Sequence, residues 1–311
     1  MSKNKLLFCV LLFTVFIFTG YAQETIKGTT TARIHKMNFS ELARYEQTNP
    51  PVQNQKITPN QAKKKPIIIN PVDESVPAFN GKKTLVDLQE NSSSVQRPTE
   101  FPCNNFRALD DDGSNNPPDV NGAIGFDYLM TTLNTQVRIQ NKQGGMISTV
   151  SLAGFWAGIG HTDIFDPKIT YDPYGRRWIF VCCATRSAAG SALLVATSDS
   201  PDPTGNWSQY AIDADPGNTF WFDYPSLGFN RNWIVVSGYM FNIPNIAGTP
   251  RTRMWVLNKD ELYASSNTIS VPTFDRTDYF HISPANTYSS TDNTLWCVTR
   301  HNNSFNNSGF V

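Results

Sequence analysis

A module of about fifty residues recurs four times in this chain, and it limits the possible folds more than any other feature. The copies begin at Asp119 (DVNGAIGFD), Asp166 (DPKITYDP), Asp223 (DYPSLGFN) and Asp278 (DYFHISPA). Each copy contains short runs of β-branched and aromatic residues separated by Gly, Pro and Asp, which is the composition of strands and turns. A repeat of this length built from strands predicts a β-propeller with one four-stranded blade per copy.

The second copy shows the four-strand pattern most clearly. Its apolar runs cover residues 168–172, 177–185, 191–197 and 207–212. About three and a half such blades fit before the last residue, whereas a propeller closes with roughly four to eight. We therefore expect an all-β chain whose residues 103–311 form the N-terminal part of a propeller. The alternative is a compact four-bladed or sandwich domain with an irregular last element.

The N-terminus carries the pattern of a secretory signal. Lys3 and Lys5 precede an apolar run over residues 6–18, and small residues lead up to a cleavage site after Ala22. The run is shorter than the roughly 20 residues that span a bilayer. We expect a signal peptide at residues 1–22 and a secreted, extracellular or cell-surface bacterial protein without a transmembrane anchor in this chain.

Residues 23–102 differ in character from the repeats. They are polar, contain a Pro50-Pro51 pair and a run of lysines at 63–65, and have few compact apolar runs. Such a segment buries too little apolar surface to offset its loss of conformational entropy. The sequence therefore predicts a flexible leader or linker between the signal peptide and the propeller.

The charge balance argues against nucleic acid as a partner. Residues 103–311 carry 13 Lys and Arg against 18 Asp and Glu. A surface that binds phosphates usually has the opposite sign. Glycans, proteins or metal ions are the expected partners, although strand tryptophans such as Trp178, Trp233 and Trp255 are expected to pack in the core.

Four cysteines follow the signal peptide, in a compartment that permits disulfides. Cys182 and Cys183 are neighbours on one expected strand, so their side chains point to opposite faces. Cys183 and Cys297 are expected to be core thiols, while Cys103 is open as a tether for the leader. The spacing of these cysteines does not match a zinc site.

An acidic loop ahead of the first repeat is a candidate metal site. Its candidate ligands are Asp110, Asp111, Asp112 and Ser114, with a glycine at 113. Calcium selects hard oxygen ligands of this kind, but the regular spacing and final Glu of an EF-hand are missing. The sequence leaves calcium binding and a solvated acidic turn as two alternatives.

The Asp residues at the repeat starts are candidate catalytic groups. The first strand of a propeller blade lines the central channel, so Asp119, Asp166 and Asp223 are expected to converge at one mouth of it. Two such carboxylates can carry acid and base chemistry, as in glycosidases, with His161 nearby as a possible base. The alternative is that each Asp accepts hydrogen bonds from its own turn.

The turn between the third and fourth strands of the second copy has a recognisable pattern. Residues 200–207 read SPDPTGNW, which resembles the Asp-box turn of sialidase-like propellers with the Gly and Thr exchanged. In those propellers the turn is a structural device away from the active mouth. The resemblance implies the fold and carries no catalytic role.

Four phrases together resemble a family of secreted, propeller-type bacterial proteins of largely uncharacterised function. The resemblance covers roughly residues 105–265 and implies an exported or surface protein, without established catalytic residues. The phrases are PPDVNG at 117–122, DP with YD at 166–172, SPDPTG at 200–205 and DYP at 223–225.

These observations favour a non-catalytic module for extracellular recognition or adhesion, which presents loops to a glycan or a protein. The alternative is a carbohydrate-active hydrolase or lyase that uses the carboxylates at the channel mouth. An enzyme makes stricter demands, because it needs a polarised pair of groups with a shifted pKa. The ligand, the total number of blades and any C-terminal domain are not determined by the sequence.

Overall fold

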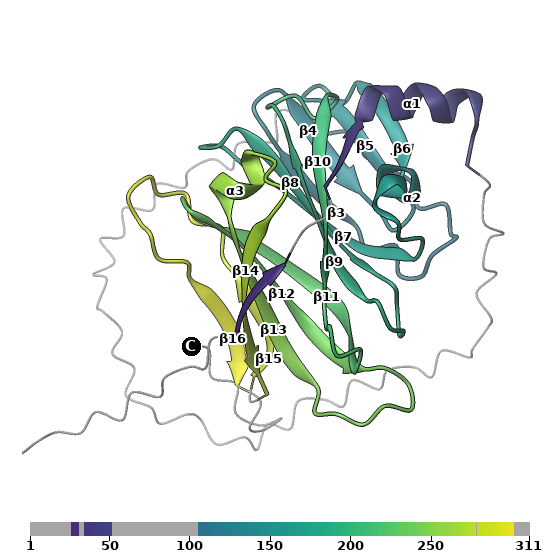
Figure 1. Cartoon of the computed structure of the whole chain (residues 1–311). Coiled ribbons are helices and arrows are strands. Elements are labelled where there is room, and N and C mark those ends of the chain that lie inside the picture. Colours follow the sequence, from purple (N-terminus) through teal and green to yellow (C-terminus); the bar gives the residue numbers. More distant parts are fainter. Residues whose placement is uncertain (1–25, 31–33, 52–104, 278, 302–311) are drawn as a thin grey trace, which may run out of the picture.

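The computed structural model describes residues 26–30, 34–51, 105–277 and 279–301, and in these residues the chain is all-β (Figure 1). Three antiparallel sheets follow one another along the chain, and in each sheet every strand pairs with the strand that precedes it. The first sheet contains β3 (Asn121–Ile124), β4 (Tyr128–Thr132), β5 (Gln136–Asn141) and β6 (Met146–Ser151). The second contains β7 (Ile164–Asp172), β8 (Arg177–Ala184), β9 (Ala192–Ser198) and β10 (Asn206–Asp213). The third contains β11 (Phe220–Phe229), β12 (Trp233–Asn242), β13 (Arg251–Asn258) and β14 (Ile269–Arg276).

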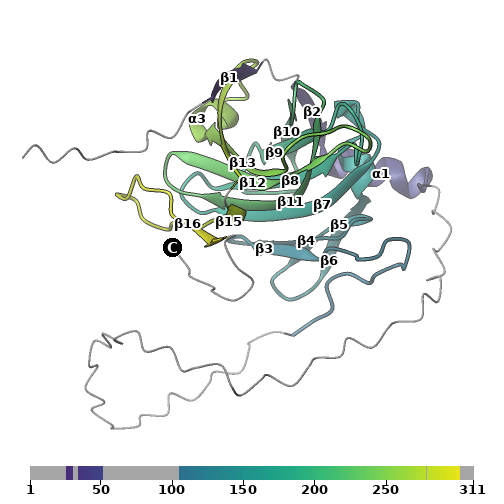
Figure 2. The same ribbon diagram turned by 90° about the horizontal axis from the view of Figure 1, so that it is seen from below.

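These sheets are blades of a β-propeller, as the repeat predicts. The first strands of successive blades contact one another in chain order, β3 against β7, β7 against β11 and β11 against β15 (Tyr279–Pro284). Figure 2 shows the blades stacked face to face with these strands on one side. Within the described residues, β15 and β16 (Cys297–His301) form the last pair of strands.

The blades are held together by apolar side chains that β8 presents to both of its neighbours. Trp178, Phe180 and Cys182 pack toward the first blade, whereas Val181 and Cys183 pack toward the third. This alternation follows from the period of two along a strand. The two thiols are therefore free and buried on opposite faces, as expected, and burial raises the pKa of each.

The segment expected to be a flexible leader is partly folded onto the blades. β1 (Ile26–Thr30) pairs with β14, and β2 (His35–Asn38) pairs with β10, so each extends a blade by one outer strand. The helix α1 (Phe39–Thr48) then packs beside β6 of the first blade. β1, β2 and α1 thus contact three successive blades, and the prediction of a leader over 23–102 is wrong for these elements.

A few residues explain why α1 holds its place. Phe39 is fully buried, and Glu46 accepts hydrogen bonds from Ser151 through its backbone amide at 2.8 Å and its hydroxyl at 2.5 Å. Ser151 precedes α2 (Leu152–Phe155) and caps it by accepting from the amide of Gly154. The short helices η1 (Ala157–Ile159) and α3 (Lys259–Tyr263) complete the described elements. The composition of the expected leader did not predict that β1, β2 and α1 fold onto the blades. Edge strands pair through the backbone, and only one large side chain of α1 is buried.

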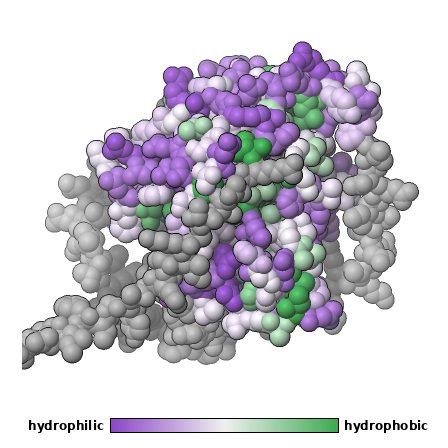
Figure 3. Space-filling model, in the orientation of Figure 1, coloured by the Kyte–Doolittle hydropathy of each residue, from purple (hydrophilic) through white to green (hydrophobic). Residues whose placement is uncertain are grey.

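The sequence predictions for the signal peptide and for Cys103 fall on residues outside the described ranges. In the described part, no helix is long and apolar enough to cross a membrane. The face of the molecule in Figure 3 is mostly hydrophilic, with hydrophobic residues in separate spots rather than one patch.

A buried ion pair joins the second and third blades. Lys259, in the first turn of α3, lies with its Nζ 2.5 Å from Oδ2 of Asp172, the last residue of β7. Asp172 is fully buried and Lys259 is 3% exposed. The hydroxyl of Tyr263 donates to the same carboxylate at 2.8 Å, and Lys259 donates to the carbonyl of Asn230 at 3.0 Å. Both charges are thus satisfied inside the protein, which a buried pair requires.

Removal of one partner of this pair should destabilise the fold strongly. We expect Asp172→Ala to lower the free energy of unfolding by about 3–5 kcal/mol, because it leaves the Lys259 charge buried without a counter-ion. The matched control is Asp110→Ala, which breaks the exposed pair with Arg107 and should cost at most about 1 kcal/mol. Urea unfolding in calcium-free buffer measures both, and equal losses would contradict a structural role for the buried pair.

Candidate functional site

One residue with a left-handed backbone lies in the first strand of each blade or, in the first blade, two residues before it. These residues are Asp119 (φ 49°), Asp166 (φ 54°), Tyr224 (φ 54°) and His281 (φ 60°). In β7, β11 and β15 the pairing with the next strand shifts register at this point, which is the mark of a β-bulge. A positive φ is uncommon in residues other than glycine and is costly for bulky ones, so its recurrence defines equivalent positions in the four blades.

This equivalence corrects the repeat as it is read from the sequence. Asp119 and Asp166 occupy the equivalent position, but in the third blade it belongs to Tyr224, and Asp223 stands one residue earlier. In the fourth blade His281 occupies it, and Asp278 lies outside the described residues. The recurrent feature is therefore a backbone conformation rather than an aspartate.

The three candidate carboxylates nevertheless meet at the mouth of the channel. The side chain of Asp166 lies within hydrogen-bonding reach of both Asp119 and Asp223. Asn134 connects two of them, since its Nδ2 donates to Oδ2 of Asp119 at 2.6 Å and its Oδ1 accepts from the amide of Asp166 at 2.8 Å. Asp223 accepts from the amide of Tyr224 at 2.9 Å. The acids thus converge as one alternative predicts, and Asp223 is the one of the three that accepts from a backbone amide beside it.

Burial and mutual repulsion change the protonation of this cluster. Burial and the charges of Asp119 and Asp223 raise the pKa of Asp166 to about 7. Burial also raises the pKa of Asp223, against the opposing effects of the Tyr224 amide, of Asp166 and of Arg186. Like charges in contact cannot all ionise, so one proton is shared within the cluster near neutral pH.

The two histidines near the carboxylates, His161 and His281, lie in different surroundings. His161, the base suggested by the sequence, contacts Thr185 through Nδ1 at 3.1 Å, and burial lowers its pKa. His281 instead comes from the fourth blade into the channel wall, where its Nε2 lies 2.9 Å from the hydroxyl of Ser226. Burial and the nearby charge of Lys168 lower the pKa of His281, so it is neutral at physiological pH.

Beside the carboxylates lies an aromatic surface that the sequence did not predict. Trp221 and Phe241 stack with ring centroids 5.4 Å apart, and Tyr239 and Tyr224 pack against Phe241 at 4.5 and 6.3 Å. Tyr224 is 57% exposed, and Asp223 is paired across the strands with Tyr239. Trp221 and Asp223 lie two residues apart on β11, and Tyr239 and Phe241 lie two residues apart on β12. Residues with this spacing share one face of a strand, and this is the sequence signal that could have revealed the surface. We call these four rings the aromatic surface.

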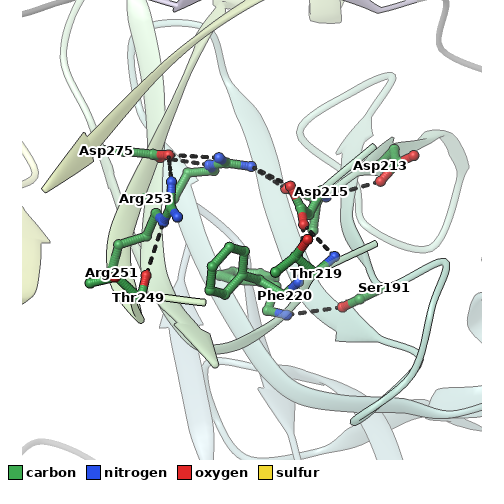
Figure 4. Close-up of polar contacts among 11 residues, drawn as sticks. Ser191, Asp213, Asp215, Thr219, Phe220, Thr249, Arg251, Arg253 and Asp275 are labelled. Carbon is green, nitrogen blue, oxygen red and sulfur yellow. Dashed lines mark hydrogen bonds and ion pairs between the residues drawn. The ribbon is translucent and has the colours of Figure 1, made fainter. Parts of the chain in front are cut away.

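A polar network fixes the connection that leads into this surface (Figure 4). Arg253 forms a bidentate pair with Asp275 at 2.6 and 2.7 Å and lies 3.9 Å from Asp215. Asp215 in turn accepts from the amides of Thr219 at 2.8 Å and Phe220 at 3.0 Å. The start of β11, which carries Trp221 and Asp223, is therefore held by charge-assisted hydrogen bonds.

Behind the mouth, the channel contains a cavity of about 420 Å³. Its wall is formed by β3, by residues 168–171 of β7, and by Leu227, Asn286 and Tyr288. Cavities of this size accommodate small ligands or one or two sugar rings. The mouth with its carboxylates and aromatic surface, together with this cavity, is the candidate site.

Carboxylates of the acidic loop ahead of the first blade accept hydrogen bonds from the loop itself. Asp111 accepts from the amide of Gly113 at 2.9 Å, and Asp112 accepts from the amide and hydroxyl of Ser114 at 2.9 and 2.6 Å. Asp110 pairs with Arg107. Across the described ranges, groups of three or more His, Cys, Asp or Glu placed to hold a metal ion are absent. Calcium binding at this loop stays a prediction.

The comparisons with known proteins add little to this geometry. The chain matches no family model, and it matches no curated protein. Among solved structures it is similar to the sucrose-6-phosphate hydrolase of Lactobacillus gasseri, with a TM-score of 0.32 and 10% identity. That likeness covers 56% of this chain and only 36% of the hydrolase, and at this level it carries no argument about function.

The shared proton of the cluster predicts a specific pH dependence of stability. The pKa of Asp166 in the folded state, about 7, lies above its ordinary value of 3.8, so between these pH values the native state holds a proton that the unfolded chain has lost. Stability must therefore fall as the pH rises through this window. We expect Asp166→Asn, which cannot ionise, to lose less stability than the wild type between pH 5 and pH 8.

Urea unfolding midpoints at several pH values test this expectation. Asp110→Asn, which removes an exposed carboxyl, serves as the control and should follow the wild-type curve. The interpretation is wrong if the wild type and Asp166→Asn show the same pH dependence.

For the acidic loop, we expect excess calcium to raise the melting temperature above that in chelator, because a ligand of the native state alone stabilises it. Asp112→Ala should remove the difference. Equal melting temperatures of the wild type in calcium and in chelator would exclude the site.

Proposed function

We propose that this chain is a secreted or cell-surface recognition module that binds a glycan at the mouth of its central channel. The observation that carries the proposal is the aromatic surface beside the carboxylates, with Tyr224 exposed at its edge. Ligand sites in proteins are concave and combine aromatic walls with a few convergent polar groups. The mouth has this composition.

The chemistry of a sugar ring fits these groups. The C–H face of a pyranose packs on an aromatic ring, while its hydroxyls donate to carboxylates and amides at its edge. Tyr224 offers an open ring, and Asp223 lies next to it along β11 with its carboxylate in the cluster. A glycan is favoured over a protein ligand because Tyr224 is the one exposed ring of the aromatic surface, whereas protein interfaces bury a broad surface of about 800 Å² per partner.

A carbohydrate-active hydrolase or lyase is the second candidate, and one observation favours it. The raised pKa of Asp166 is suited to a general acid near neutral pH, with Asp119 beside it as the second carboxyl. Glycosidase carboxyls, however, stand roughly 5–9.5 Å apart to leave room for the scissile bond. Asp166 interacts directly with Asp119, whereas the carboxyls of a glycosidase pair are separated by the substrate, so recognition is the first proposal.

Binding of a panel of neutral and acidic oligosaccharides to the secreted chain tests the proposal. We expect Tyr224→Ala to weaken binding by roughly 5- to 30-fold, because the sugar loses the exposed ring, which is worth about 1–2 kcal/mol. Tyr45→Ala, which removes an exposed tyrosine from α1, should leave the affinity unchanged. Titration calorimetry gives the affinities.

The same samples separate the two candidates. Chromatography of the oligosaccharides after long incubation reports any cleavage, and cleavage that is lost in Asp166→Asn would establish the second candidate. Failure of every oligosaccharide to bind, or equal binding by the wild type and Tyr224→Ala, would overturn the site proposed here.

A further inference from the structure

The left-handed positions also place a second set of side chains at equivalent points of the channel wall. Two residues after Asp119, Asp166 and Tyr224 stand Asn121, Lys168 and Ser226. Asn121 and Lys168 line the cavity behind the mouth, and Ser226 precedes Leu227, which also lines it. Asn121 and Lys168 thus bring polar groups to the cavity wall, whereas the Ser226 hydroxyl lies against His281.

Lys168 is the cation of this layer, and its charge is not neutralised by a carboxylate. Its side chain is half-buried, and within the described residues it forms no hydrogen bond or ion pair. Its neighbour across β8 is Val181, which packs toward the third blade, so Lys168 lies on the side of β7 that faces β11. An anion that enters the cavity would give this amino group a counter-ion.

The surroundings of Lys168 are suited to hydrogen bonding rather than to charge repulsion. Burial and Lys168 keep His281 neutral, so that it does not add a second cation. Ser226 lies 2.9 Å from His281 and can orient its hydroxyl toward a ligand. The carboxylates of the mouth interact with one another and with Arg186. Lys168 is not among the groups that change the pKa of Asp166 or Asp223.

We propose that the channel cavity binds the carboxylate of an acidic sugar, and that the glycan recognised at the mouth is therefore a uronic-acid-containing one. Lys168, which lines the cavity, is the counter-ion. This inference rests on the proposed glycan-binding function and names its ligand class. A neutral ring packs on the aromatic surface while the acidic residue enters the cavity, because the two ends of the site differ in charge.

The experiment compares a xylo-oligosaccharide that carries one glucuronic acid with its methyl ester, which has the same rings without the charge. We expect the wild type to bind the acid at least about tenfold more tightly than the ester, a difference of about 1.4 kcal/mol. Lys168→Met keeps the aliphatic stem and removes the charge, so it should abolish the preference. Added salt should weaken it in the wild type.

Arg44→Met is the matched control, because it removes one exposed positive charge from α1 and should keep the preference. Thermal melts confirm that both variants are folded. The inference is overturned if acid and ester bind the wild type equally, or if Lys168→Met retains the preference. Neutral glycans that bind through Tyr224 without preference for the acid would overturn this inference and leave the proposed function standing, whereas failure of every glycan would remove both.

Discussion

The architecture depends on how each blade satisfies the free edge of its innermost strand. A propeller blade leaves this edge without a partner strand, and unpaired amides are costly when buried. Here a side chain near the start of the third strand of one blade accepts from an amide of the next blade's first strand. Asn134 accepts from Asp166 at 2.8 Å, Ser191 from Phe222 at 3.0 Å, and Thr252 from His281 at 3.1 Å. Each blade is thereby held in register with its neighbour.

The same contacts explain why chemistry gathers at the mouth. The left-handed residues lie where these hydrogen bonds are made, so the bulge is held by the neighbouring blade as well as by its own strand. The buried pair of Lys259 and Asp172 holds the opposite end of β7 against the third blade. With both ends of the strand fixed, the side chains at the bulge cannot relax away from one another, and the carboxylates of the cluster stay in contact despite their repulsion.

Sequence reasoning predicted the blades well because strand patterns are local. The expected runs at 177–185, 191–197 and 207–212 agree with β8, β9 and β10 to within a residue. It placed the start of β7 late, because Asp166 and Pro167 look like a turn although they are a bulge inside the strand. The convergence of the acids followed from the topology. The aromatic surface did not, because strand aromatics are usually core and their exposure depends on which face a neighbouring blade covers.

The bulge constrains the backbone conformation at its position, but it does not determine which side chain stands there. Asp119 and Asp166 tolerate a positive φ because their side chains are short and polar, but Tyr224 and His281 pay a steric cost in the same conformation. A costly residue persists at such a point when the fold imposes the conformation and the side chain has a separate use. The exposed ring of Tyr224 at the aromatic surface and the imidazole of His281 in the channel wall are such side chains, so the residues least suited to the bulge are those that most directly mark where a ligand would bind.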